Sequence, residues 1–223
     1  MGSSTHDDRR EVAVLFADLA GYTALTEAHG DEEAARAAMR LLDLAHAAYD
    51  GRALVVKSLG DGVMLAFGDA TVALTAALAL SHAARAEERF PGLRVGVQAG
   101  PAVLRDGDVF GATVNEASRI AHEAAPGQVL VASGVVDRLA DPTRVELVEL
   151  GPTQLRHVRD PVELFAVRDD PRGDSGVLVD PVCRMQVDRD SAETVLRRHD
   201  GRPVRFCSSS CARLFADHPD AYV

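Results

Sequence analysis

The sequence has few aromatic residues and few cysteines. Tryptophan is absent, aromatic residues make up 4% of the chain, and the three cysteines, Cys183, Cys207 and Cys211, all lie within the last 41 residues. An odd number of cysteines in so short a segment does not fit a disulfide framework and favours a reducing compartment with a thiol or metal site. We therefore expect a cytoplasmic protein.

Long apolar runs and excess positive charge are also missing. The longest apolar run, residues 72–80, is interrupted by Thr75 and is far shorter than the roughly 20 residues of a membrane-spanning helix, so no membrane partner is expected. The formal net charge is −10, whereas nucleic-acid-binding proteins need a basic surface to neutralise phosphates. An anionic substrate would need metal ions or a few local cations. The hydrophobic content of 47% is enough for a folded core.

The order of predicted elements indicates an α+β fold. Apolar runs, glycine turns and helical periodicity predict strand 12–18, helix 32–49, strands 53–58 and 63–67, helix 70–90, strand 93–99, helix 113–125, and strands near 128–132, 145–149 and 162–167. The first six elements follow the order of a ferredoxin-like antiparallel sheet with helices.

Composition also divides the chain into domains. We predict a polar tail at 1–10, a first domain at 11–168, a linker at 169–176, and a small cysteine-containing module at 177–223. The linker is charged and contains proline and glycine, as exposed connections do. The small cysteine-containing module is too short to build a large hydrophobic core alone, so we expect it to be stabilised by a further element such as a bound metal ion.

Two carboxylates stand at neighbouring strand ends in this scheme. Asp18 ends the first strand, and Asp61 lies at the tip of the hairpin formed by 53–58 and 63–67. Carboxylates brought close together repel each other and usually require a cation.

The blocks around these acids resemble the class III adenylate and guanylate cyclases. Residues 15–23 (LFADLAGYT) and 57–62 (KSLGDG) are similar to the two metal-binding motifs of that family. Residues 107–111 (GDVFG) and 114–119 (VNEASR) resemble its substrate-contact block, and the likeness covers about residues 11–168. It implies the fold of a nucleotide cyclase domain.

The resemblance also implies the metal chemistry. Asp18, Asp61 and the backbone carbonyl of Leu19 would hold two Mg²⁺ or Mn²⁺ ions per active site. One ion lowers the pKa of the ribose 3′ hydroxyl and the other neutralises the triphosphate, as in two-metal phosphoryl transfer.

Substrate roles follow from the same likeness. Asn115 and Arg119 are four residues apart on a predicted helix and so share a face; their family equivalents orient the ribose and stabilise charge on the α-phosphate. Arg156 stands where the family often has a lysine that meets the terminal phosphates.

Lys57 and Asp108 predict the choice of base. Adenine offers an acceptor at N1 and a donor at its amino group, which a lysine and an aspartate complement, whereas guanine reverses the pattern. Guanylate cyclases of the family typically carry Glu and Cys at these two positions, so ATP is the expected substrate.

The sequence therefore predicts an adenylate cyclase that converts ATP to 3′,5′-cyclic AMP and pyrophosphate. In the family, the metals come from one subunit and the base-reading residues from its partner, which implies a homodimer with two equivalent sites. The alternatives are a catalytically silent nucleotide sensor and a metal-binding signalling protein.

The last 47 residues resemble a YHS domain, a small metal-associated module, through DPVCRM at 180–185 and FCSSSC at 206–211. Three thiolates suit Zn²⁺ or Cu⁺, and His218 or His199 could supply a fourth ligand. The alternative is that the cysteines are buried free thiols. One hypothesis is that this module couples metal or redox state to cyclase output.

Overall fold

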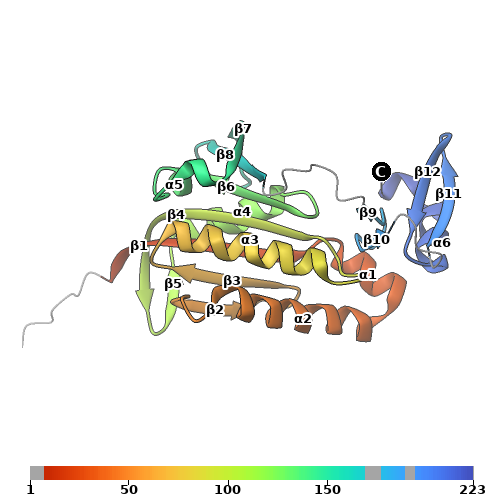
Figure 1. Cartoon of the computed structure of the whole chain (residues 1–223), viewed down its shortest axis with the longest axis horizontal. Coiled ribbons are helices and arrows are strands. Elements are labelled where there is room, and N and C mark those ends of the chain that lie inside the picture. The colour runs from red at the N-terminus through yellow and green to blue at the C-terminus, as the bar shows by residue number, and fades with distance from the viewer. Residues whose placement is uncertain (1–7, 169–176, 189–193, 223) are drawn as a thin grey trace, which may run out of the picture.

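The computed structural model of the chain describes residues 8–168, 177–188 and 194–222 (Figure 1). The predicted linker, residues 169–176, and residues 1–7 of the predicted tail lie outside the described part. Helices are α1 (Tyr22–His29), α2 (Asp31–Tyr49), α3 (Ala70–Ala86), α4 (Ala112–Glu123), α5 (Ser133–Val136) and α6 (Ser209–Asp217), with 3₁₀ turns at Pro142–Arg144 and Pro219–Ala221. Strands are β1 (Arg9–Leu19), β2 (Val55–Ser58), β3 (Gly62–Phe67), β4 (Leu93–Arg105), β5 (Asp108–Phe110), β6 (Gln128–Ala132), β7 (Glu146–Thr153), β8 (Val162–Arg168), β9 (Val177–Val179), β10 (Gln186–Asp188), β11 (Val195–His199) and β12 (Arg202–Phe206).

One large sheet organises the N-terminal part. Its strand order is β2-β3-β1-β4-β6-β8-β7, and β5 pairs with β4. The β4–β6 pairing is parallel, and the other pairings of this sheet are antiparallel. The first four strands therefore have the ferredoxin-like order that the sequence predicts, and the α+β fold with an antiparallel-rich sheet is confirmed.

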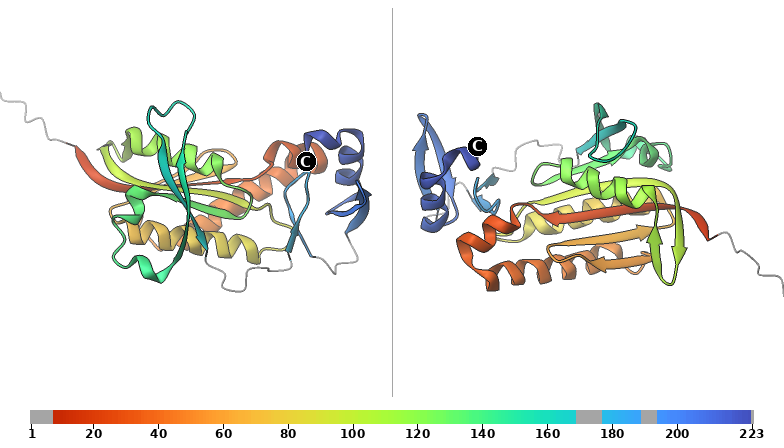
Figure 2. Two further views of the ribbon diagram at one scale, coloured as in Figure 1. Left: turned by 90° about the horizontal axis from the view of Figure 1, so that it is seen from above. Right: turned by 180° about the vertical axis from the view of Figure 1, so that it is seen from behind.

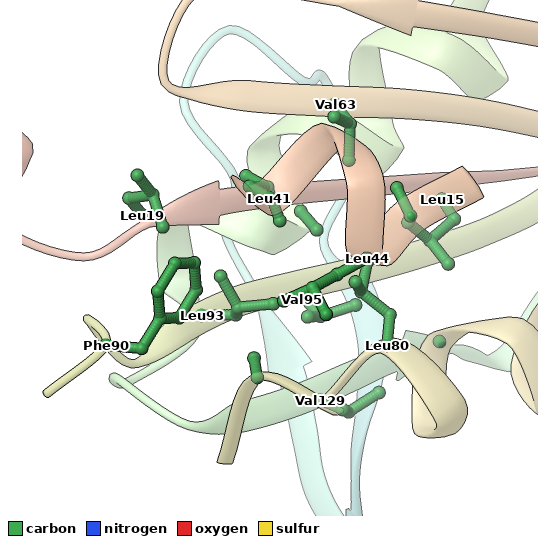
Figure 3. Close-up of a cluster of buried hydrophobic side chains, with 14 of the residues drawn as sticks. Leu15, Leu19, Leu41, Leu44, Val63, Leu80, Phe90, Leu93, Val95 and Val129 are labelled. Atoms are coloured by element: carbon green, nitrogen blue, oxygen red, sulfur yellow. The ribbon is translucent and has the colours of Figure 1, made fainter. Parts of the chain in front are cut away.

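Alternation along β1 buries both faces of the sheet. Leu15 and Leu19 belong to the hydrophobic cluster that includes Leu41 of α2 and Leu80 of α3 (Figure 3). Neighbouring residues such as Val14 point the other way and pack in a second cluster with residues of α4. Because side chains alternate between the faces of a strand, β1 is the buried centre of a three-layer arrangement.

Helix α4 lies unusually close to the sheet at Gly96 of β4. A Cβ atom added to Gly96 would lie 2.7 Å from the carbonyl oxygen of Ala117 and 2.7 Å from the Cα atom of Ala121. It would also collide with the backbone nitrogen of Ala121. Glycine at this position is therefore what lets α4 rest directly on the strand backbone.

Several elements differ in length from their predicted extents, and α3 and β4 are discussed here because they shape the site. Helix α3 ends at Ala86 instead of near residue 90, because Glu87 is already extended and the chain then turns to bury Phe90 in the core. Strand β4 continues to Arg105, six residues beyond the predicted end. It forms a hairpin with β5 through Asp106 and Gly107, which both have positive φ, as a two-residue hairpin turn requires.

The residues after 176, here called the C-terminal module, consist of the β9–β10 and β11–β12 hairpins and α6. Figure 2 shows them at the end of the large sheet where α1 lies. Met185 forms a β-bridge with Pro91, and the amide of Gln186 donates to the carbonyl of Phe90 at 3.1 Å. Buried residues of the module share one hydrophobic cluster with β1, α2 and α3. In the part of the chain that is described, no helix combines the length and apolar character needed to cross a bilayer.

Candidate nucleotide and metal sites

Asp18 and Asp61 lie at the same edge of the sheet. Asp18 pairs in register with Gly62 of β3, and the amide of Leu19 donates to the carbonyl oxygen of Asp61 at 3.0 Å. A Cβ atom on Gly62 would lie 3.3 Å from the Cβ atom of Asp18 and 3.1 Å from a β1 carbonyl, so glycine keeps this corner open. The hairpin thus brings both predicted acids to one end of β1.

Asp18 is held by a cation that sequence reasoning missed. The Nε of Arg94, on β4, donates to Oδ1 of Asp18 at 2.7 Å. Burial raises the pKa of Asp18, the Arg94 hydrogen bond opposes this shift, and the charge of Asp61 adds to it. The only signal for Arg94 in the sequence is that it is the one charged residue of the predicted strand 93–99. Two carboxylates with a single compensating guanidinium are a ligand set that fits divalent cations that prefer oxygen.

A second polar set joins β2 to β5. Lys57, the only lysine of the sequence, forms an ion pair with Asp108. Its hydrogen bond lowers the pKa of the Asp108 carboxyl, as does the amide of Val109, which donates to Oδ1 at 2.7 Å. The structure thus brings together the two residues predicted to read the base.

Phe110 extends this second set and was not predicted as part of a site. Its ring centroid lies 6.0 Å from Nζ of Lys57, and the residue is 52% exposed. An exposed aromatic ring beside a donor and acceptor pair offers a surface on which a planar base can stack.

Asn115 and Arg119 lie on α4, as predicted. Thr113, Ala117, Ile120 and Ala121 form the buried face of this helix, so Asn115 is exposed and Arg119 partly buried on the other side. Among the described residues, neither side chain has a hydrogen bond or ion pair to another side chain. Both are therefore available to a ligand.

The acid pair and the base-reading pair are far apart along the sheet. Asp18 pairs with Arg94 at the start of β4, whereas Asp108 pairs with Arg105 at its end. Arg105 comes eleven residues after Arg94, which corresponds to about 35 Å of strand. Arg156 lies apart from both sets in the β7–β8 connection, where its Nε donates to Nε2 of His157 at 3.1 Å.

The three cysteines converge on a histidine of the N-terminal part. Cys207 Sγ lies 3.4 Å from Cys183 Sγ and 3.6 Å from Cys211 Sγ. Nε2 of His29, the last residue of α1, lies 3.3 Å from Cys207 Sγ and 3.5 Å from Cys211 Sγ. The three cysteines are buried and free of disulfides.

The structure places a different histidine beside the cysteines from the two that the sequence suggests. The four-residue group contains His29, not His199 or His218. His199 packs edge-on against Phe215 with ring centroids 5.2 Å apart, and His218 follows the last turn of α6. Both suggested histidines lie near the cysteines in the sequence, whereas His29 lies 154 residues before Cys183 and reaches them through tertiary packing.

Comparison with known proteins identifies the N-terminal part. Residues 5–169 match the adenylate and guanylate cyclase catalytic domain family. The chain is 41% identical over 162 residues to a pH-sensitive adenylate cyclase of Mycobacterium tuberculosis, which covers 71% of this chain and 41% of that protein. It is 42% identical over 134 residues to an adenylate cyclase of Streptomyces coelicolor, which covers 58% of this chain and 34% of that protein.

Solved structures agree on the fold. An adenylate cyclase of Trypanosoma brucei, described in its monomeric state, superposes with a TM-score of 0.65 and 23% identity, and covers 73% of this chain and 89% of that chain. The match over residues 5–169 shows that the chain belongs to the family of adenylate and guanylate cyclase catalytic domains. It spans less than half the length of these two curated relatives.

Proposed function

We propose that this protein is an adenylate cyclase that converts ATP to 3′,5′-cyclic AMP and pyrophosphate. The observation that carries the proposal is the presence, in a cyclase fold, of both the Asp18–Asp61 corner and the Lys57–Asp108 pair. The names of the mycobacterial and streptomycete relatives support the same activity. Because the metal-binding acids and the base-reading pair are both present, we favour an enzyme that turns over ATP rather than a catalytically silent nucleotide sensor.

The choice of ATP rests on hydrogen-bond complementarity. Nζ of Lys57 would donate to N1 of adenine, and the carboxylate of Asp108 would accept from the exocyclic amine. Guanine presents a donor at N1 and an acceptor at O6, so both contacts would be mismatched. A mismatched polar group costs about 1–3 kcal/mol, which is enough to exclude GTP when two contacts fail together.

Asp18, Asp61 and the carbonyl of Leu19 would hold two Mg²⁺ or Mn²⁺ ions. When bound, such ions lower the pKa of the 3′ hydroxyl and stabilise charge on the leaving pyrophosphate. Arg94 keeps Asp18 oriented, and its hydrogen bond favours the ionised form that a metal requires.

The remaining residues would act on the sugar and phosphates. Asn115 would orient the ribose so that its 3′ oxygen faces the α-phosphorus, and Arg119 would donate charge-assisted hydrogen bonds to the α-phosphate oxygens. Arg156 would contact the terminal phosphates.

We further propose that each site is shared between two copies of the chain. One copy would supply the Asp18 corner, and its partner would supply Lys57, Asp108, Asn115 and Arg119. The strand length that separates Arg94 from Arg105 supports this division, because a two-fold pairing can bring opposite ends of two sheets together.

The C-terminal module would be a YHS-type domain. The domain boundaries and the cytoplasmic location stay predictions.

The direct test is an assay of the purified full chain with ATP or GTP and with Mg²⁺ or Mn²⁺. We expect cyclic AMP from ATP and little product from GTP. Asp61→Asn should abolish turnover, whereas Asp50→Asn, an exposed acid at the end of α2 with positive φ, is the matched control and should leave it unchanged. No cyclic product with either metal, or a preference for GTP, would contradict the proposal.

A further inference from the structure

Four of the six distances among the ligand atoms of His29 and the three cysteines are close to the edges of a tetrahedral zinc site. The Sγ–Sγ distances of 3.4 and 3.6 Å and the Sγ–Nε2 distances of 3.3 and 3.5 Å are edges of the group. With Zn–S near 2.3 Å and Zn–N near 2.0–2.1 Å, a tetrahedral zinc site has edges of about 3.8 and about 3.6 Å. All four ligand atoms lie within 4.8 Å of one another. The group therefore needs only small shifts to enclose an ion.

The surroundings of the thiols are built around a buried carboxylate. Asp180 is 0% exposed. Its Oδ1 accepts from the amides of Val182 at 2.8 Å and Cys183 at 3.3 Å, and its Oδ2 accepts from the amide of Cys207 at 2.7 Å. One side chain thus fixes the two turns that present the first two thiols, as an outer-shell residue does in metal sites.

No cation compensates these acidic groups within the part of the chain that the structure describes. Three buried thiols and one buried carboxylate lie together, and the basic side chain in hydrogen-bond contact with the thiols is His29. Thiolates buried without a counter-charge are costly, so these cysteines can ionise here only together with a bound cation such as a divalent metal ion.

A disulfide is a poorer explanation of the cluster. The Sγ atoms are 3.4 and 3.6 Å apart, well beyond the bonded distance of about 2.05 Å. A disulfide would also leave one thiol unpaired and give His29 no role. The convergence of all four side chains favours a shared ligand.

We propose that His29, Cys183, Cys207 and Cys211 bind one Zn²⁺ ion, which joins the C-terminal module to the end of α1. The site is completed only when the two parts of the chain are together, because the imidazole comes from the N-terminal part. Zinc binding displaces the thiol protons and leaves three thiolates and a neutral imidazole as ligands.

The position of this site links it to the Asp18 corner. Helix α1 begins three residues after Leu19 and ends at His29. At its start, the amide of Ala20 donates to the carbonyl of Gly92 at 2.9 Å, and the amide of Gly92 donates to the carbonyl of Arg184 at 3.1 Å. Zinc bound by Cys183 and His29 would therefore hold both ends of α1.

The first experiment measures zinc in the full chain. The purified wild type should carry zinc in stoichiometric amount, and His29→Ala should bind it at least about 100-fold more weakly, since outer-shell changes alone cost 10–100-fold. His46→Ala changes an exposed histidine of α2 and should bind like wild type. His29→Cys restores a fourth zinc ligand and should recover most of the affinity, which separates ligation from a loss of folding.

The second experiment measures hydrogen exchange by mass spectrometry, without using enzyme activity. Zinc should slow exchange in residues 20–29 of the wild type but not of His29→Ala, and α5, which has no ligand, should not change. Zinc affinity equal in wild type and His29→Ala, copper in place of zinc, or a disulfide between two of the cysteines would overturn the proposal. Because neither readout involves ATP, failure of the zinc proposal is distinguishable from failure of the proposed cyclase activity.

Discussion

Gly96 is the position where a single methyl group should do the most damage. In the Gly96→Ala variant, the new Cβ would meet the backbone of α4 at Ala117 and Ala121, at distances of 2.7 Å and less. Real Cβ atoms do not approach backbone so closely, so α4 must move away from β4. Overpacking of this kind costs about 1–3 kcal/mol. For a chain of this size that lowers Tm by about 2–12 °C.

The same displacement of α4 should also lower turnover. Asn115 and Arg119 both lie on α4, and misplacing catalytic groups by about 1 Å can cost about 100-fold in rate. The matched control is Gly68→Ala, where the nearest atom to a new Cβ is Leu54 Cδ1 at 3.9 Å. We expect calorimetry to show no loss of Tm in that variant. Gly96→Ala with wild-type Tm and turnover would refute the close packing of α4 on β4.

Three further substitutions test the site. Lys57→Ala removes a charged donor worth about 1.5–3 kcal/mol, so initial rates should show kcat/KM for ATP about 10–150-fold lower; an unchanged value would exclude Lys57 from base recognition. Phe110→Ala should raise KM for ATP about fivefold or more, as expected for lost stacking, while Tm stays within about 2 °C because the ring is exposed; an unchanged KM would exclude stacking. Burial raises the pKa of Asp18 above its ordinary value of 3.8, so the ionised acid costs stability above that value. Without added metal, Asp18→Asn should therefore melt higher than wild type at pH 7, with the gap closing as the pH falls from the raised pKa towards 3.8; a lower Tm for the variant at pH 7 would contradict this.

Local patterns were enough to predict most of the fold. The apolar run of β1 and the Gly60–Gly62 hairpin are properties of short segments, so the strands around Asp18 and Asp61 lie where they were expected. Lengths were less predictable. No helix-breaking residue precedes Pro91, so the sequence has no local signal for the end of α3 at Ala86; that end is set by burial of Phe90.

Contacts between distant segments could not be predicted in this way. Arg94 looks like an ordinary strand residue until β4 is placed beside Asp18. His29 looks like a residue at a helix end until the C-terminal module packs against α1. Both depend on tertiary pairing over many residues, which the local periodicity of one sequence does not encode.

Mixing two inactive variants tests the shared site most directly. Asp18→Ala removes a metal ligand and Arg119→Ala removes the phosphate donor, so each homodimer should lack turnover. Heterodimers formed by co-refolding should contain one site with both residues intact, and the mixture should regain about a quarter of wild-type activity if pairing is random. A mixture that produces no more cyclic AMP than the two variants assayed separately would contradict the division of the site between two copies.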